Sequence, residues 1–127
     1  MALYCGIDLH SRDSWLTIMY EVGDVARFRK VGNFASYCRL VNTARLSAGK
    51  RKGSGNPRNG NPHLSWAFSE AAHHAVRHHP EAQKFYQRKR AKTNGIIAIR
   101  ALAHKLARAS YHVMRDQVDF DPEKTFA

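Results

Sequence analysis

Apolar residues recur every three or four positions most regularly in the last third of the chain, which predicts an amphipathic helix from about Ile96 to Arg115. Residues three and four apart lie on the same side of a helix, so the pattern separates into two stripes. The apolar stripe is Ile99, Leu102, Leu106, Ala109 and Val113. The polar stripe is Arg100, His104, Arg108 and His112.

Three shorter helices are predicted before this one. The first covers Asn33 to Val41, the second runs from Asn61-Pro62 to Pro80, and the third covers Glu81 to Lys92 with Phe85 and Tyr86 inward. The apolar face of the second helix comprises Leu64, Phe68, Ala71, Ala72 and Ala75. Helical spacing also predicts packing roles for Trp66, Phe68, Phe85 and Tyr111.

The first twenty residues have a different pattern. Leu3 to Asp8 and Trp15 to Tyr20 are apolar stretches separated by turn formers, which predicts a β-hairpin of marginal stability. Ser47 to Pro62 is dominated by Gly, Asn, Pro, Ser and basic residues and predicts a loop. The expected fold is therefore mainly α, a small helical domain preceded by an N-terminal β-hairpin.

Composition limits the class of protein. A chain of 127 residues with 43% hydrophobic residues fits one modest folded domain. Cys5 and Cys38 form neither a disulfide framework nor a zinc spacing, which favours a reducing compartment. No apolar run approaches the roughly 20 residues of a membrane span, and Asp8 and Asp13 are atypical of a signal peptide. We expect a cytoplasmic protein, associated with the nucleoid if it binds DNA.

Positive charge is in excess and unevenly distributed. Lys and Arg number 21 against 10 Asp and Glu, which gives a formal net charge of +11. The stretches Val25 to Ser69 and Ala82 to Arg115 contain no acidic residue. Because uncompensated charge costs stability by self-repulsion, this pattern indicates a polyanionic partner and favours a nucleic acid. An anionic membrane surface and an acidic protein are the alternatives.

Asp8 is the first candidate for chemistry, because it ends the first predicted strand and a carboxylate fixed there suits Mg²⁺. Two-metal nucleases need several such carboxylates, and no comparable acid lies on a second strand. A solvated residue at the end of a strand is the alternative.

Ser47 is the second candidate, at the start of the segment Ser47-Ala48-Gly49-Lys50-Arg51-Lys52-Gly53. Glycines let backbone N–H groups approach a phosphate closely, and the three cations attract it. A serine beside them is a candidate nucleophile for a phosphodiester, although no dedicated base is evident. The alternative is a flexible basic arm without a catalytic role for Ser47.

Eight histidines raise the question of a metal site. His74 and His78 are spaced as ligands on one helix, but only Glu70 is placed as a third ligand. The preferred interpretation is a polar helix face that gains positive charge near pH 6.

Two stretches carry a family resemblance. The first is Tyr4-Cys5-Gly6-Ile7-Asp8-Leu9-His10-Ser11. The second contains, in order, Val31-Gly32-Asn33-Phe34-Ala35-Ser36-Tyr37-Cys38-Arg39, Ser47-Ala48-Gly49-Lys50-Arg51-Lys52-Gly53, Asn59-Gly60-Asn61-Pro62-His63-Leu64, Trp66-Ala67-Phe68 with Glu70-Ala71-Ala72, Phe85-Tyr86-Gln87-Arg88-Lys89 and Ala103-His104-Lys105-Leu106-Ala107-Arg108-Ala109. Together they resemble the transposases of the IS-one-ten type, which are bridge-RNA-guided insertion-sequence recombinases. The first stretch is similar to the first strand of their RuvC-like DEDD domain, and the second to their C-terminal serine transposase domain.

The resemblance implies a catalytic site shared between two domains. In that family four DEDD acids hold Mg²⁺, and a serine of the C-terminal domain attaches to DNA. Asp8 matches the first acid and Ser47 the serine, while the other three acids have no counterpart here. We therefore expect Ser47 and Asp8 as catalytic residues, Asp8 as a metal ligand, and Mg²⁺ as a cofactor that this chain does not hold alone. The expected nucleic-acid-binding residues are Lys50, Arg51, Lys52, Arg58, Arg88, Lys89, Arg90, Lys92, Arg100 and Arg108.

The two stretches abut near Ile18 to Glu21, whereas a large segment separates them in full-length members, so the chain resembles an internally deleted transposase. Residues 1–20 are expected to be a poorly anchored RuvC-like remnant, 21–115 a helical transposase domain with a basic loop at 47–62, and 116–127 an irregular tail. The expected function is that of a bacterial transposase fragment that binds DNA and carries the serine but is inactive alone.

The expected partners are DNA, a bridge RNA, and a second copy of the chain or a full-length transposase, with no membrane. The alternatives are a non-catalytic DNA- or RNA-binding module and a dominant inhibitor of a full-length transposase.

Overall fold

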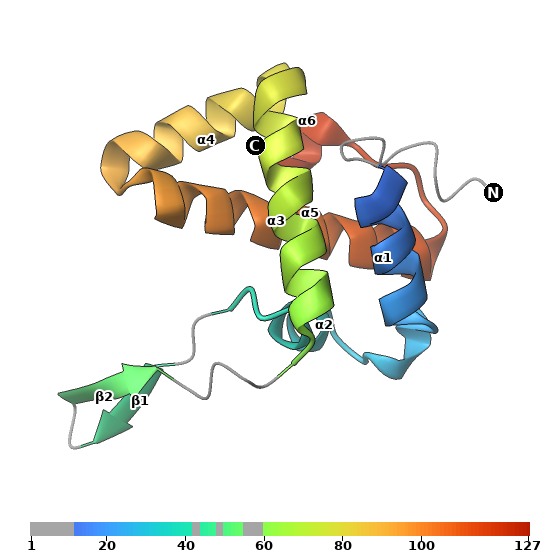
Figure 1. The fold of residues 1–127 in the computed structure, drawn as a ribbon, viewed down its shortest axis with the longest axis horizontal. Helices are drawn as coiled ribbons and strands as arrows, with labels where there is room; N and C mark the ends of the chain where they lie inside the picture. The colour runs from blue at the N-terminus through green and yellow to red at the C-terminus, as the bar shows by residue number, and fades with distance from the viewer. Residues whose placement is uncertain (1–11, 42–43, 48–49, 55–59) are drawn as a thin grey trace.

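A computed structural model describes residues 12–41, 44–47, 50–54 and 60–127. Over these ranges the chain forms six α-helices, one 3-10 helix and two short β-strands (Figure 1). The elements are α1 (Arg12–Val22), η2 (Val25–Arg27), α2 (Val31–Tyr37), β1 (Ala44–Ser47), β2 (Lys50–Ser54), α3 (Pro62–His78), α4 (Pro80–Lys92), α5 (Gly95–Asp116) and α6 (Pro122–Thr125). Helices dominate these ranges, so the expectation of a mainly α fold is confirmed.

The two longest helices, α3 and α5, cross at the centre of the molecule (Figure 1). Helix α1 packs on α3, while α2 and α4 pack on α5. The predicted apolar face of α3 is buried along its whole length. On α5 the buried face is wider than the predicted stripe, because other helices contact α5 from several sides. Its buried residues are Ala98, Leu102, Ala103, Leu106, Ala107, Ser110, Tyr111, Val113 and Met114.

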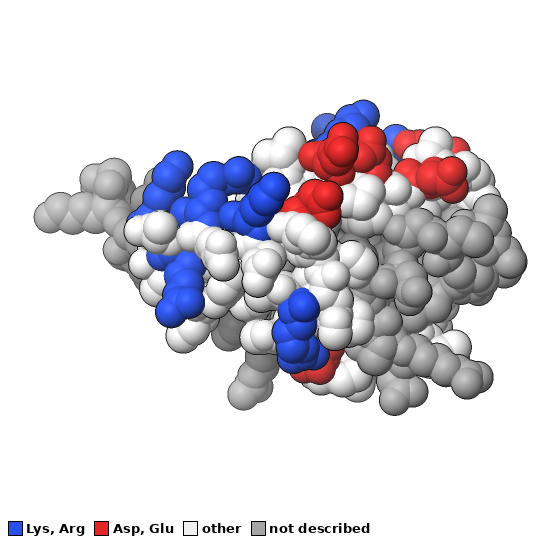
Figure 2. Space-filling model, turned by 90° about the horizontal axis from the view of Figure 1, so that it is seen from above, with Lys and Arg blue, Asp and Glu red and all other residues white. Residues whose placement is uncertain are grey.

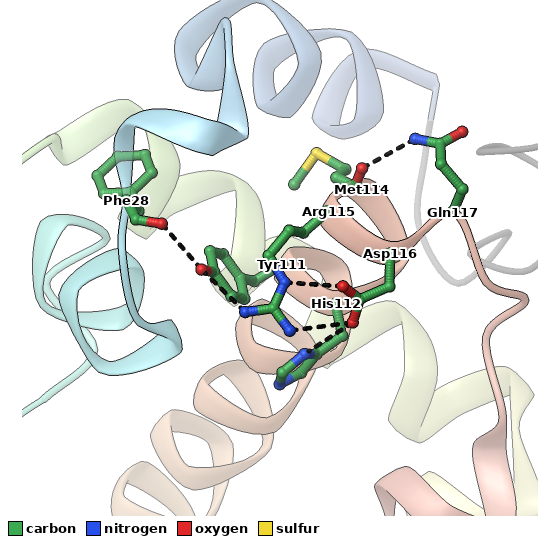
Figure 3. A network of polar contacts seen from close by, with 7 residues as sticks. All are labelled: Phe28, Tyr111, His112, Met114, Arg115, Asp116 and Gln117. Atoms are coloured by element: carbon green, nitrogen blue, oxygen red, sulfur yellow. Dashed lines mark hydrogen bonds and ion pairs between the residues drawn. The ribbon is translucent and has the colours of Figure 1, made fainter.

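An aromatic cluster fills the space between α2, α3 and α5. The ring of Phe34 lies 5.3 Å from Phe28, 6.2 Å from Phe68 and 5.7 Å from Tyr111, measured between ring centroids. The Tyr111 hydroxyl donates a hydrogen bond of 2.8 Å to the carbonyl oxygen of Phe28 (Figure 3). A buried tyrosine needs such a partner, and this bond ties the segment before α2 to α5.

The predicted N-terminal β-hairpin is wrong in its second half, because Trp15 to Tyr20 lies inside α1. Its first half, Leu3 to Asp8, lies outside the described residues. Ile18 and Val22 are 0% and 1% exposed and belong to the core. Burial at a spacing of four residues thus outweighs the β propensity of the stretch. This burial also shows that the described end of residues 1–20 is well anchored, contrary to expectation.

The aromatic packing residues are mostly where the helical spacing predicts. Phe68, Phe85 and Tyr111 are buried, but Trp66 is 49% exposed, so its predicted packing role is wrong. The neighbours of Trp66 on α3, Leu64 and Ala67, are buried. Trp66 therefore lies at the margin of the buried face of α3, where a prediction from spacing alone is least certain.

The predicted loop from Ser47 to Pro62 contains regular structure that its composition conceals. β1 and β2 form an antiparallel pair in which Ser47 lies opposite Lys50 and Leu46 opposite Arg51, with an irregularity between Ala44 and Leu46. The strands pair with each other and far less with the helices, among the described elements. Backbone hydrogen bonding forms such a ladder without an alternating apolar pattern, which is why the sequence did not predict it.

The C-terminal segment after α5 is not wholly irregular, as was predicted, since it contains the one-turn helix α6. The Asp121 carboxylate accepts a hydrogen bond of 3.3 Å from the backbone N–H of Lys124, and Pro122 occupies the first turn. Phe120 and Phe126 are buried, with ring centroids 6.0 Å apart. These two rings fix the segment on the helical domain.

Candidate nucleic-acid interface

The β1–β2 hairpin leaves the helical domain between α2 and α3, where Gly60 and Asn61 form a lock. The backbone N–H of Asn61 donates to the carbonyl oxygen of Tyr37 at 2.7 Å. Its side-chain oxygen caps the first turn of α3 at 2.8 and 3.1 Å, and its amide donates to Glu21 Oε2 at 2.8 Å. Asn61 therefore connects α1, α2 and α3 through its backbone and its side chain.

Gly60 completes the lock because no other residue fits there without strain. Its φ is +94°, a region that L side chains rarely adopt. A Cβ at this position would lie 2.5 Å from the carbonyl oxygen of Tyr37. Gly60, just before α3, thus passes directly against the end of α2.

The hairpin carries the predicted nucleophile and the first group of predicted cations. Ser47 is the last residue of β1, and Lys50, Arg51 and Lys52 open β2. The register places Ser47 as the ladder partner of Lys50, so their backbones are adjacent. Two predicted site residues, Asp8 and Arg58, lie outside the described residues.

Helix α4 carries the second group of predicted cations. Arg88, Arg90 and Lys92 are exposed, and Lys89 is partly buried. Arg88 also has a structural contact, because it donates a hydrogen bond of 3.3 Å to the carbonyl oxygen of Phe126. The sequence did not predict this contact, which joins α4 to the C-terminal segment.

Helix α5 adds two exposed cations from the prediction, Arg100 and Arg108. Arg100 donates a hydrogen bond of 2.7 Å to the carbonyl oxygen of Arg39, which connects α5 to the end of α2. Lys105, which was not among the predicted binding residues, places its ammonium 5.0 Å from the ring centroid of Phe85. This contact between Lys105 and Phe85 depends on the packing of α4 against α5, which the sequence pattern does not show.

Charges are unevenly distributed over the face of the molecule that Figure 2 shows. Figure 2 shows Lys and Arg gathered at one end of the visible face, where Figure 1 places α4, and Asp and Glu gathered towards the other end. In the C-terminal segment, Asp119, Asp121 and Glu123 are exposed. A polyanion is therefore attracted to the end with α4 and repelled from the acidic end.

Cations near the acidic end are partly neutralised by a local network (Figure 3). Arg115 holds both carboxylate oxygens of Asp116, with distances of 2.8 and 3.1 Å, and His112 Nδ1 lies 3.5 Å from the same carboxylate. The hydrogen bond from Arg115 lowers the pKa of Asp116, and His112 lowers it further. Arg115 is thus the partner of an acid and not an uncompensated cation.

Burial shifts the pKa of two further groups, His104 and Cys38. Burial is the main cause that lowers the pKa of His104, and the charges of Arg108 and Lys105 lower it further. Burial raises the pKa of the Cys38 thiol to about 12, so this thiol is not a nucleophile at neutral pH.

A metal centre is not formed by the described part of the chain, where no three His, Cys, Asp or Glu side chains are grouped as ligands. The rings of His74 and His78 lie 4.4 Å apart, and His79 is 6.4 Å from His74. The predicted metal ligand, Asp8, lies outside these residues.

An open groove of about 690 Å³ lies between α5 and the C-terminal segment. Its charged lining residues are Lys105, Arg108, Asp116, Asp119, Asp121 and Lys124, and His112 also lines it. Because both signs line it, the groove is a poor site for a phosphate. The sequence did not predict it, since its two walls come from separate elements.

The chain combines a helical domain, a basic hairpin and a cationic end. The sequence model described as the Transposase IS116/IS110/IS902 family matches residues 10–87, which is more than half of the chain. The chain therefore belongs to this transposase family of mobile elements, and the resemblance to the IS-one-ten type is confirmed. The matched range includes α1, α2, the hairpin and α3 in full and the part of α4 up to Gln87. No curated protein matches the chain. In the described residues, no helix is both long and apolar enough to cross a membrane.

Proposed function

We propose that this chain is a DNA-binding transposase fragment that acts in DNA transposition and carries the serine nucleophile on its β1–β2 hairpin. The observation that carries the proposal is the separation of charge on a domain of this family (Figure 2). Exposed Lys and Arg without acidic neighbours attract a polyanion, and membership of a transposase family favours DNA. The family's guide RNA is a second proposed partner, bound through the same cations.

The hairpin supports a nucleophilic role for Ser47. Its backbone lies beside that of Lys50, at the start of three consecutive cations. In the proposed step Ser47 Oγ attacks a phosphodiester phosphorus. The new Oγ–P bond forms while the bond from phosphorus to the departing sugar oxygen breaks, the serine hydroxyl gives up its proton, and the departing oxygen takes up one proton to leave as a hydroxyl. Lys50, Arg51 and Lys52 would stabilise the negative charge that develops on the phosphoryl oxygens.

We further propose that the chain is internally deleted and inactive alone. Only three residues separate Asp8 from α1, and α1 already packs on α3. This spacing leaves no room for the three further DEDD acids that the family resemblance calls for. One carboxylate is too few for two-metal chemistry, so Mg²⁺ would be held only in a complex with an intact copy. The proposed location is the bacterial cytoplasm, on the nucleoid.

DNA binding is tested by fluorescence anisotropy with a labelled duplex at several salt concentrations. We expect the observed affinity to fall steeply as salt rises, because each phosphate contact releases counterions. Replacing Lys50, Arg51 and Lys52 by Ala together should weaken binding at least tenfold and reduce the salt slope by up to about 0.9 per lost contact. The control loses the same charge outside the proposed interface, with Arg29, Lys30 and Lys124 replaced by Ala. An equal loss of affinity in the control contradicts the proposal.

The nucleophile is tested by mixing the chain with a full-length family transposase whose own serine is replaced by Ala. We expect a covalent protein–DNA adduct of this chain in the mixture and none with the chain alone. The adduct should disappear in Ser47→Ala and persist in Ser54→Ala, a serine of the same hairpin. DNA binding without any adduct would favour a non-catalytic binding module.

Recombination of a plasmid with its guide RNA tests whether the chain is inactive alone. Product formed by this chain without a partner, and lost in Ser47→Ala, contradicts the proposal. Addition of the chain to an intact transposase distinguishes complementation from inhibition. A fall in product as the chain is added would identify it as a dominant inhibitor.

A further inference from the structure

The turn between α4 and α5 is short and held by hydrogen bonds. Only Thr93 and Asn94 separate the two helices. The Thr93 hydroxyl donates to the carbonyl oxygen of Lys89 at 2.7 Å, and the Asn94 side chain accepts from the backbone N–H of Ile97 at 2.9 Å. Gly95 lies so close to α4 that a Cβ there would be 3.3 Å from the Tyr86 hydroxyl. The turn is therefore preorganised.

This turn presents apolar side chains at the far end of the helical domain, at the left in Figure 1. Ile96 is 77% exposed and Ile97 is 46% exposed, whereas the next residue, Ala98, is fully buried. Most of the Ile96 side chain makes no contribution to the core. A β-branched apolar residue at a helix start is also a weaker choice for the helix than many polar residues. The fold alone thus does not account for Ile96.

Exposed cations lie close to these isoleucines in sequence, and no acid does. Arg90 and Lys92 are exposed on the last turn of α4, and Arg100 follows Ile96 by one helical turn on α5. The stretch from Ala82 to Arg115 has no Asp or Glu. Figure 2 shows the gathering of Lys and Arg at this end of the molecule.

We propose that Ile96 is a wedge that unstacks a base step of duplex DNA while Arg90, Lys92 and Arg100 hold the flanking phosphates. The proposal rests on the DNA binding proposed above. Proteins that bend DNA insert apolar residues, isoleucine among them, between base pairs from the minor groove. Charge complementarity favours the duplex, because each base step is flanked by phosphates and the residues near Ile96 in sequence are cations without an acid among them. The rigid turn lowers the ordering cost of insertion.

The experiment uses the full chain and a duplex with 2-aminopurine at a TpA step, which unstacks readily. Its fluorescence rises when the base is unstacked, and anisotropy of a second label reports binding. We expect the wild-type chain to raise the 2-aminopurine signal. Ile96→Ala should lose this rise and about tenfold in affinity, with an unchanged salt slope because the phosphate contacts remain. Ile96→Met should keep the rise, since methionine also acts as a wedge.

Val118→Ala is the matched control, because Val118 is 51% exposed but lies beyond α5, beside the acidic residues. It should bind and unstack as the wild type does. Thermal unfolding followed by circular dichroism should give the same midpoint for all variants, since the replaced side chains are exposed.

Three results would overturn the wedge. The first is that the wild type binds DNA but does not raise the 2-aminopurine fluorescence, or that the Ile96→Ala variant raises it as much as the wild type does. The second is unstacking of a matched RNA duplex but not of the DNA. The third is binding of anionic phospholipid vesicles that depends on Ile96 while unstacking of DNA does not. Failure of the wild type to bind any duplex overturns the proposed DNA binding itself, and so is distinguishable from all three.

Discussion

The helical domain and the β1–β2 hairpin differ in what stabilises them. Helices α1 to α6 bury apolar faces against one another, around the crossing of α3 and α5. The two strands, in contrast, pair mainly with each other, and their residues are predominantly basic and small. Yet the hairpin carries the proposed nucleophile and three of the proposed DNA-binding cations. The segment with the proposed chemistry is thus the least integrated into the core.

The segment that carries the hairpin is attached to the helical domain at Gly60 and Asn61, although its strands pack little on the helices. The Gly60–Asn61 lock fixes the end of the hairpin segment to α2, α3 and Glu21 of α1. Functional residues are often carried by such segments on a stable scaffold, because the segment can fit a ligand without disturbing the core. Stability and binding should therefore respond to different substitutions.

Phe34→Ala should have the largest effect on stability. Phe34 is fully buried and contacts the rings of Phe28, Phe68 and Tyr111. Removing a buried phenylalanine side chain costs about 3–5 kcal/mol, from lost burial and the cavity left behind. Urea denaturation followed by circular dichroism measures this loss of unfolding free energy. The control is Ser36→Ala, at an exposed position on the same helix. A fall in the free energy of unfolding of less than about 1 kcal/mol would show that Phe34 is not central to the core.

Gly60→Ala should come next, because it strains the junction between the two regions. The positive φ and the close approach to the Tyr37 carbonyl should together cost about 1–3 kcal/mol. Gly32→Ala is the matched control, since a Cβ there meets nothing within 4 Å and lies within α2. It should be neutral or stabilise by up to about 1 kcal/mol. Equal effects of the two changes in urea denaturation would contradict the lock.

Ser110→Ala should stabilise the helical domain by about 1 kcal/mol. Ser110 is 1% exposed on α5, and its hydroxyl finds no hydrogen-bond partner among the described residues. A buried polar group without a partner costs free energy that an alanine does not. Thermal unfolding should show a higher midpoint for the variant. A lower midpoint would mean that the hydroxyl is satisfied in solution.

His104 should make stability depend on pH. Burial, with Arg108 and Lys105, lowers its pKa in the folded state below the ordinary value of 6.5. As pH falls through 6.5, the unfolded chain therefore takes up the proton first, and the folded state loses stability until the folded pKa is passed. His104→Gln should reduce this loss between pH 7 and pH 5. An NMR titration of the His104 ring with a midpoint above 6.5 would contradict the sign.

The smallest effect on stability should come from the hairpin. Replacing Lys50, Arg51 and Lys52 by Ala should change the free energy of unfolding by no more than about 0.5 kcal/mol, because the strands pack little on the helices. The same variant is expected to lose most of its DNA affinity. A large fall in its unfolding midpoint would remove the contrast between the two regions.

The helices after residue 60 follow from the sequence to within a few residues. Their apolar stripes, the breaks at Pro80 and Asn94-Gly95, and the cations on α4 and α5 are all visible in the pattern. Charge and family resemblance predict candidate binding residues, and α4 and α5 present five of them, Arg88, Arg90, Lys92, Arg100 and Arg108, as exposed cations. Their role in binding nucleic acid stays a prediction. The nucleophilic role of Ser47 stays a prediction.

Local sequence determined the helical periods and the net charge of +11, because both depend on near neighbours or on composition alone. Only the tertiary structure decided that Trp15 to Tyr20 is helical, since burial of Ile18 against the core selects the helix over the strand. It also decided that Asn61 joins three helices, and that Ile96 stays exposed beside cations. These outcomes depend on contacts between residues far apart in sequence, which no local pattern encodes.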